Sequence, residues 1–191
     1  VACHLAGGTH HAFKDWGSGF FVFNDLAYAS IALLNQKKVK KILILDLDVH
    51  QGDGTASICE NIDNIFTCSI HCKNNFPFDK KNSNLDVPID DEVNDIKYIN
   101  ILTKTLDQIE SNFTPDIVFY DAGVDVHSND DLGNLNLTDD GIKKRDEIVC
   151  EYFKEKKIPL CTVIGGGYSK NRQELASRHF SIFETVSKTY L

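Results

Sequence analysis

The 191-residue sequence contains no methionine and no Cys-x-x-Cys pair. It also lacks a signal peptide and any apolar run long enough to cross a membrane. Without a Cys-x-x-Cys pair, a zinc knuckle built from thiolates is not expected. Because the chain starts at Val1 and has no methionine, we expect it to be a fragment whose N-terminal part is missing.

The sequence also lacks the positive charge of a nucleic-acid-binding protein. Its formal net charge is -8 and its isoelectric point is about 5.3, which argues against direct binding to a phosphate backbone. This balance suits a cationic partner, such as a lysine-rich tail or a polyamine. It equally suits an acidic surface that keeps the protein in solution.

The six cysteines indicate a reducing compartment rather than a disulfide framework. Several of them lie in apolar runs, as Cys68 and Cys161 do, which is typical of buried free thiols. We therefore expect a cytoplasmic location, or a nuclear one in a eukaryote, and no contact with a membrane.

Apolar runs alternate with amphipathic segments along the chain. Nearly continuous apolar runs predict buried parallel strands at residues 41–46, 65–70, 117–120 and 160–164. Helical patterns cover residues 25–37 and 96–112, and Thr138 and Asn171 are candidate N-caps of helices that run to about residues 155 and 187. Residues 73–94 are predicted to form a surface loop. The alternation predicts a single α/β domain over residues 1–191, a three-layer parallel sheet with helices on both faces.

Chemically active side chains follow the predicted strands. Because the carboxyl ends of parallel strands meet at one edge of a sheet, the segments after residues 46, 70, 120 and 164 are expected to open together. Asp48, His50 and Asp125 are the predicted metal ligands. Two carboxylates and one imidazole suit zinc and leave a position open for water and substrate. The same ligand set also suits iron or cobalt.

Two further features supply groups that can move protons. His10 and His11 follow two glycines, and a histidine beside a metal site is a natural general base. Asp46 and Asp53 are the candidate acids that fix the tautomers of these rings. A tyrosine, Tyr168, follows three glycines after the last predicted strand, where a phenol can donate to a developing oxyanion.

Taken together, the motifs resemble those of one enzyme family. The segments are Gly-Gly-Thr-His-His-Ala at 7–12, Asp-Leu-Asp-Val-His-Gln-Gly-Asp-Gly at 46–54, Asp-Ala-Gly-Val-Asp at 121–125 and Gly-Gly-Gly-Tyr at 165–168. They resemble the zinc-dependent histone deacetylases of the arginase–deacetylase fold, most closely the class IV branch and its bacterial relatives. The resemblance implies hydrolysis of the amide in acyl-lysine, in a protein or in an acylated small amine.

The resemblance also implies a role for each matching residue. Asp48, His50 and Asp125 match zinc ligands, His11 with Asp53 matches the general base, and His10 with Asp46 matches its electrostatic partner. Tyr168 matches the phenol that polarises the acyl carbonyl. The substrate-binding positions are Gly19, Phe20, Phe76 and Gly166, of which the two phenylalanines match walls of the acyl-lysine tunnel. A structural potassium site matches Asp46, Asp48, His50, Ser69 and Ile70.

Two departures from the family pattern leave the chemistry intact. Phe21 stands where many members have cysteine, and Gln51 stands where many have a second histidine. Relatives also have further strands before the first motif, so we expect residues 1–191 alone to hold the active site loosely and to be inactive.

Two alternatives remain open: an acetylpolyamine amidohydrolase, which uses the same residues, and a catalytically impaired scaffold that binds acyl-lysine. An arginase-like manganese enzyme fits less well, because its pattern lacks the paired histidines and the glycine–tyrosine motif.

Overall fold

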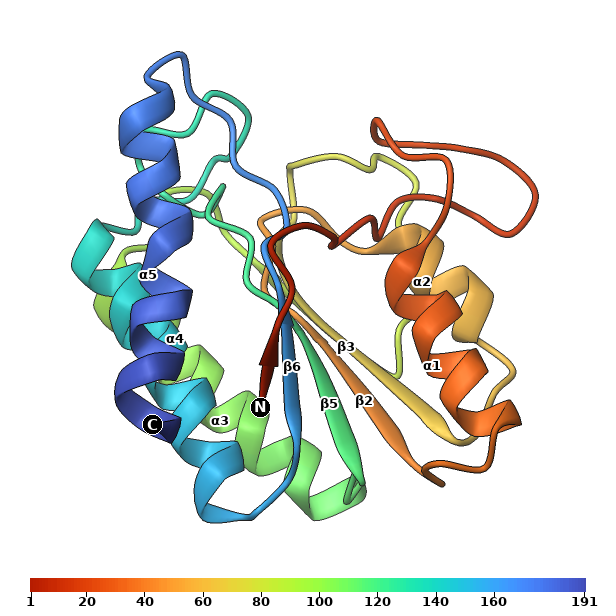
Figure 1. Ribbon diagram of the computed structural model, residues 1–191. Coiled ribbons are helices and arrows are strands. Elements are labelled where there is room, and N and C mark those ends of the chain that lie inside the picture. Colours follow the sequence, from red (N-terminus) through yellow and green to blue (C-terminus); the bar gives the residue numbers. More distant parts are fainter.

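A six-stranded sheet forms the middle layer of the computed structural model, which covers residues 1–191 (Figure 1). All its strands are parallel, in the order β1-β6-β5-β2-β3-β4. The strands are β1 (Ala2–Cys3), β2 (Ile42–Asp46), β3 (Ile65–Cys72), β4 (Leu85–Ile89), β5 (Ile117–Asp121) and β6 (Leu160–Val163). The helices are α1 (Asp25–Asn35), α2 (Asp53–Cys59), α3 (Asp95–Asn112), α4 (Asp139–Glu155) and α5 (Arg172–Tyr190).

The central strand β2 is buried on both faces. Its side chains alternate between the two outer layers, because successive residues of a strand point to opposite faces. Leu43 and Leu45 belong to the larger apolar core, which α3, α4 and α5 cover. Ile42 and Ile44 belong to a smaller core with α1 and α2 on the opposite face. Figure 1 shows these two helices on one side of the sheet and α3, α4 and α5 on the other. The predicted three-layer arrangement is therefore confirmed.

The register of the sheet brings polar strand ends together. Asp46 is paired with Asp121 of β5 on one side and with Ser69 of β3 on the other. Because all the strands run in one direction, the segments that follow β2, β3, β5 and β6 leave the sheet at the same edge. The four sequence motifs therefore gather there, as expected from the sequence.

Two strands and one helix differ from the sequence prediction. The four predicted strands are present, but β1 and β4 lie at the two edges of the sheet and were missed. Residues 85–89 were assigned to a surface loop, and this assignment was wrong. The strand β4 contains a proline and is only partly buried, which is tolerated at an edge because only one side of the strand is paired. The short helix α2 was not predicted from the sequence, because it begins at Asp53, inside the Asp-rich motif of residues 46–54.

The predicted helix starts agree with the structure. Thr138 Oγ1 accepts a hydrogen bond from Gly141 N at 3.1 Å and caps α4. Asn171 Oδ1 accepts from the backbone N–H of Gln173 and Glu174 and caps α5. No helix combines the length and the apolar composition that a membrane span requires. All six cysteines are free thiols, and four of them are buried.

Candidate metal centre and active site

Asp48, His50 and Asp125 converge on one point at the carboxyl edge of the sheet. His50 Nδ1 lies 3.0 Å from Asp48 Oδ1 and 3.1 Å from Asp125 Oδ2. All three side chains are buried. The first two come from the segment after β2 and the third from the segment after β5, so neighbouring strands of one rigid sheet hold the cluster.

Backbone N–H groups orient the two carboxylates. Asp125 Oδ1 accepts from Val49 N at 2.9 Å, and Asp48 Oδ2 accepts from Gly166 N at 2.7 Å. A Cβ atom on Gly166 would lie 2.2 Å from Asp125 Oδ2 and 2.6 Å from Asp48 Oδ2. Glycine is therefore required at position 166, and the close approach of its backbone fixes the carboxylates.

The cluster fits a divalent metal ion. One ligand atom from each residue lies within 4.8 Å of the others, and Asp125 Oδ2 is buried with no hydrogen bond beyond its ion-pair contact with His50. Burial and the nearby Asp48 raise the pKa of Asp125 to about 7. At His50 the burial penalty is outweighed by Asp125 and Asp48, which raise its pKa to about 10. Asp48 and Asp125 thus place two carboxylates beside the imidazole of His50, and two carboxylates with one imidazole form a ligand set that zinc accepts.

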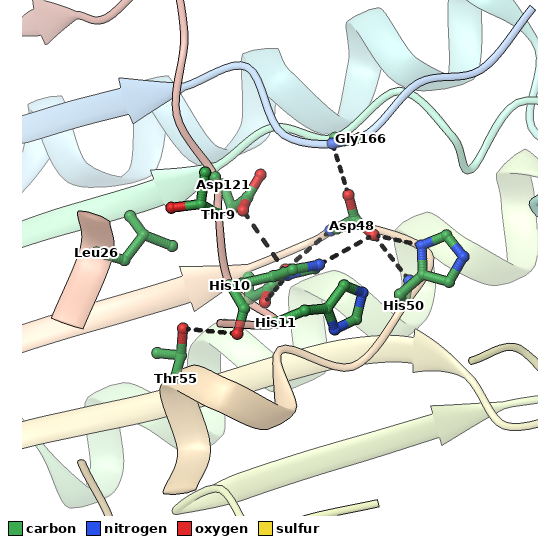
Figure 2. A network of polar contacts seen from close by, with 12 residues as sticks. Thr9, His10, His11, Leu26, Asp48, His50, Thr55, Asp121 and Gly166 are labelled. Atoms are coloured by element: carbon green, nitrogen blue, oxygen red, sulfur yellow. Dashed lines mark hydrogen bonds and ion pairs between the residues drawn. The ribbon is translucent and has the colours of Figure 1, made fainter. Parts of the chain in front are cut away.

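His10 and His11 are each hydrogen-bonded to a different aspartate. His10 Nδ1 lies 2.7 Å from Asp46 Oδ2, and His11 Nδ1 lies 2.6 Å from Asp53 Oδ1. Their ring centroids are 4.1 Å apart, and Figure 2 shows both beside Asp48 and His50. Burial and the neighbouring His10 lower the pKa of His11. At His10 the carboxylates outweigh the burial penalty and raise the pKa well above its usual range.

The start of α1 holds the loop that carries the histidines. Asp25 Oδ1 accepts hydrogen bonds from the backbone N–H of Thr9 at 2.9 Å and from its hydroxyl at 2.6 Å. Asn24, the N-cap of α1, donates through Nδ2 to the carbonyls of His10 and Ala12. The helix start thus fixes the shape of a loop that has no regular structure of its own.

Tyr168 lies near His50, the histidine of the candidate metal centre. Its ring centroid is 6.4 Å from that of His50, and the side chain is partly buried. Burial and the negative charges of Asp48 and Asp125 raise the pKa of Tyr168. The phenol is therefore protonated at neutral pH and can act as a hydrogen-bond donor.

The predicted substrate-binding residues border the site unequally. The Phe76 ring packs edge-on against His11, with centroids 4.9 Å apart. Gly19 has a φ of 53°, and a Cβ atom there would lie 2.3 Å from His11 Cδ2. In contrast, Phe20 is 82% exposed, and its ring lies 6.1 Å from that of Tyr168. Phe76 and Gly19 therefore enclose His11, whereas Phe20 projects from the surface.

A fifth buried acid of the site, Asp121, was given no role from the sequence. Its two carboxylate oxygens are buried without a hydrogen-bond partner, and Oδ2 lies 3.9 Å from His10 Nδ1. Together with Asp46 it places a second carboxylate near the same ring, which stabilises the imidazolium form of His10. The signal in the sequence was its position as the last residue of a strand beside the one that ends at Asp46.

Arg145 was also given no role from the sequence, and its side chain binds the backbone beside the metal ligands. This fully buried guanidinium on α4 donates to the carbonyls of Leu47, Ala122 and Gly123, at the ends of β2 and β5. Its charge is balanced by Asp146 at 2.9 Å. The sequence offered only an adjacent Arg–Asp pair in a helix, which is usually a solvated pair.

The potassium site implied by the resemblance stays a prediction. Asp46 and Ser69 are paired in the sheet, so part of the proposed ligand set is close together. Ser69 Oγ, however, is 3.1 Å from His71 Nδ1 and has a partner within the chain.

Comparison with known proteins agrees with this geometry. The histone deacetylase domain family matches residues 1–183, and the chain belongs to that family. An uncharacterized protein of Picosynechococcus sp. is 44% identical over 190 residues, covering 100% of this chain and 63% of its own length. Histone deacetylase 2 of Arabidopsis thaliana is 31% identical over 176 residues, covering 89% of this chain and 45% of its own.

Solved structures share the fold. The crystal structure of a histone deacetylase homologue from Aquifex aeolicus has a TM-score of 0.82 and 30% identity, and it covers 98% of this chain and 52% of that one. A histone deacetylase homologue in complex with SAHA has a TM-score of 0.83. This chain therefore spans between about half and two-thirds of the length of these relatives. The comparisons do not single out the class IV branch, which stays a prediction.

Proposed function

We propose that this chain carries the catalytic centre of a zinc-dependent hydrolase that removes acyl groups from lysine side chains. One observation carries the proposal: a ligand set for a divalent ion, two histidine–aspartate pairs and a phenol converge at one edge of the sheet. Figure 2 shows His10, His11, Asp48 and His50 of this group. Family membership supports the same reaction class.

Asp48, His50 and Asp125 would hold the ion. The chemistry that zinc supplies when bound is Lewis acidity, which lowers the pKa of water and polarises a carbonyl oxygen. Gly166 N and Val49 N keep the two carboxylates in place, because each donates to one of them.

His11 is the residue best placed to move a proton. Its Nδ1 is engaged with Asp53, so Nε2 is the atom that takes a proton from the attacking water. The same nitrogen then gives the proton to the leaving amine, which releases lysine and a carboxylate. His10 has more carboxylates around it and favours the charged form, so it acts as an electrostatic partner.

Tyr168 supplies a hydrogen bond to the oxygen that becomes negative during attack. Because the phenol stays protonated, it can donate to this oxyanion more strongly than to the neutral carbonyl. Phe76 and Gly19 cover His11 and limit the access of bulk water to it.

The test is a mass-spectrometric survey of the full-length protein against acylated lysine peptides and acylated polyamines. The proposal predicts hydrolysis of the peptides, loss of activity after exhaustive chelation and recovery when zinc is added. Undiminished activity after chelation would exclude the metal-dependent mechanism. Hydrolysis of the polyamines alone would favour the acetylpolyamine amidohydrolase alternative, and binding without turnover would favour the scaffold.

A further inference from the structure

A short turn, residues 130–134, forms hydrogen bonds with the backbone of Tyr168. Asp130 Oδ2 accepts a hydrogen bond from Tyr168 N at 2.6 Å, and Asp131 N donates to Tyr168 O at 2.9 Å. Both polar groups of the Tyr168 backbone are thus bonded to consecutive residues of one turn. This contact matters because the three glycines that precede Tyr168 impose little steric restraint on the backbone by themselves, so its path depends on the contacts that it makes.

The same aspartate also shapes the turn itself. Asp130 Oδ1 accepts hydrogen bonds from Leu132 N at 2.9 Å and from Gly133 N at 3.0 Å. One carboxylate oxygen therefore serves the turn and the other serves Tyr168. Hydrogen bonds to an ionised acceptor are stronger than neutral ones, so this carboxylate ties the two segments together firmly.

The turn also rests against a predicted metal ligand. A Cβ atom on Gly133 would lie 1.8 Å from the carbonyl oxygen of Asp125. Since only glycine allows this approach, the turn and the backbone of Asp125 are fixed against each other.

A third contact reaches the segment that carries Phe76. Asn75 is buried, donates through Nδ2 to Leu132 O at 2.6 Å and accepts through Oδ1 from Asn134 N at 3.0 Å. The next residue in the chain is Phe76, which packs on His11. The turn therefore contacts the segments that carry the phenol, one ligand and one aromatic wall.

We propose that Asp130 is the positioning residue of Tyr168 and that the 130–134 turn sets the phenol relative to the metal centre. The inference rests on the proposed function, because it assigns Tyr168 to the reaction. Asp130 bonds only to backbone groups and does not take part in the chemistry. A displacement of about 1 Å at a reacting group can cost on the order of 10²-fold in rate, so fixing this backbone has kinetic consequences.

The substitution Asp130→Asn isolates this contact, because the amide has the shape of the carboxylate but only one acceptor oxygen. With that oxygen on Leu132 and Gly133, which offer two N–H groups, the new NH₂ group faces Tyr168 N and cannot accept from it. The turn is retained and the link to Tyr168 is lost. The matched control is Asp131→Asn, the same change at the next residue, whose exposed side chain makes no hydrogen bond or ion pair in the structure.

The first measurement is amide hydrogen exchange in the full-length protein, resolved by residue. In Asp130→Asn, the Tyr168 amide should exchange at least about 10-fold faster, while the amides of Leu132, Gly133 and strand β2 keep their wild-type rates. Asp131→Asn should match the wild type throughout. Unchanged protection of Tyr168 in Asp130→Asn would overturn the proposal, and so would faster exchange throughout the domain, which indicates general destabilisation.

The second measurement is a double-mutant cycle in kcat with an acetyl-lysine peptide. Asp130→Asn should lower kcat by about 10- to 100-fold with metal content unchanged. In a Tyr168→Phe background it should lower kcat by less than about twofold, because the group it positions is already gone. Equal effects in both backgrounds would overturn the proposal. If the wild type hydrolyses no acyl-lysine, the proposed function fails, whereas the exchange experiment still decides whether Asp130 holds Tyr168.

Discussion

The floor and the rim of the site are built differently. The floor consists of His10, His11, Asp48, His50 and Asp125, all of which are buried. Asp48, His50 and Asp125 follow the ends of β2 and β5, whereas the two histidines lie in a loop that the start of α1 holds. The rim consists of Gly19, Phe20, Phe76 and Tyr168, which come from loops and range from partly buried to 82% exposed. The rim residues depend on contacts between loops for their positions, whereas the sheet positions the metal ligands of the floor and the start of α1 holds its two histidines.

This difference between floor and rim is the one expected for the proposed hydrolase. Groups that carry charge need a rigid, water-poor setting, where electrostatic interactions are strong. Groups that meet a variable substrate can lie on loops over a fixed scaffold. Substitutions in the floor should therefore act on metal binding and kcat, and those in the outer rim mainly on KM.

The largest effect is expected for Asp125→Ala. It removes one of two carboxylate ligands and leaves His50 beside Asp48 alone, so the bound metal should fall from about one ion per chain to almost none. Hydrolysis should fall below detection. Elemental analysis of the purified full-length protein measures the metal.

The control for this loss is Asp79→Ala, because Asp79 is exposed and its only ion pair is with Lys81. This variant should keep its metal and its activity. Full metal occupancy in Asp125→Ala would show that the ion binds elsewhere and would remove the basis for calling this cluster the floor.

The floor could be predicted from the sequence because local patterns specify it. An apolar run that ends in Asp-x-Asp-x-His places Asp48 and His50 at a strand end, and a second run places Asp125 at the neighbouring one. Arg145 and Asn75 could not be predicted, since their partners lie far along the chain and depend on how the helices and loops pack. The edge strand β4 was missed because its pattern, with a proline and an aspartate, is weak.

The second effect in size separates the two histidines within the floor. His11→Ala should lower kcat by about 10²- to 10⁴-fold, the range for loss of a general base, while the metal stays bound. His10→Ala should cost less, because His10 is assigned an electrostatic role. Steady-state kinetics on metal-loaded variants measure both, and a larger loss in His10→Ala would exchange the two roles.

Tyr168→Phe tests the inner edge of the rim. The ring remains and only the hydroxyl is lost, so kcat should fall by about 10²- to 10³-fold, equal to roughly 3–4 kcal/mol of transition-state stabilisation. Metal content and thermal stability should match the wild type, and KM should change little. A rate within about twofold of the wild type would show that the hydroxyl takes no part in catalysis and that Tyr168 only packs beside the site.

The smallest effects are expected in the outer rim, where Phe76 and Phe20 form a matched pair for the same substitution. Phe76→Ala removes a ring that packs on His11 and is the proposed wall of the acyl-lysine tunnel. Burial of each substrate CH₂ group against such a wall contributes about 0.8 kcal/mol. Phe76→Ala should therefore raise KM by up to about 10-fold. Phe20→Ala removes an exposed ring whose nearest aromatic neighbour is 6.1 Å away, so its effect on KM should be smaller. Both variants should keep kcat within about threefold of the wild type, because neither ring bonds to a reacting group. KM and kcat measured for one acetyl-lysine peptide decide the comparison. A larger KM effect at Phe20 would mean that substrate binding orders the exposed loop, and that the rim is completed only when a ligand is present.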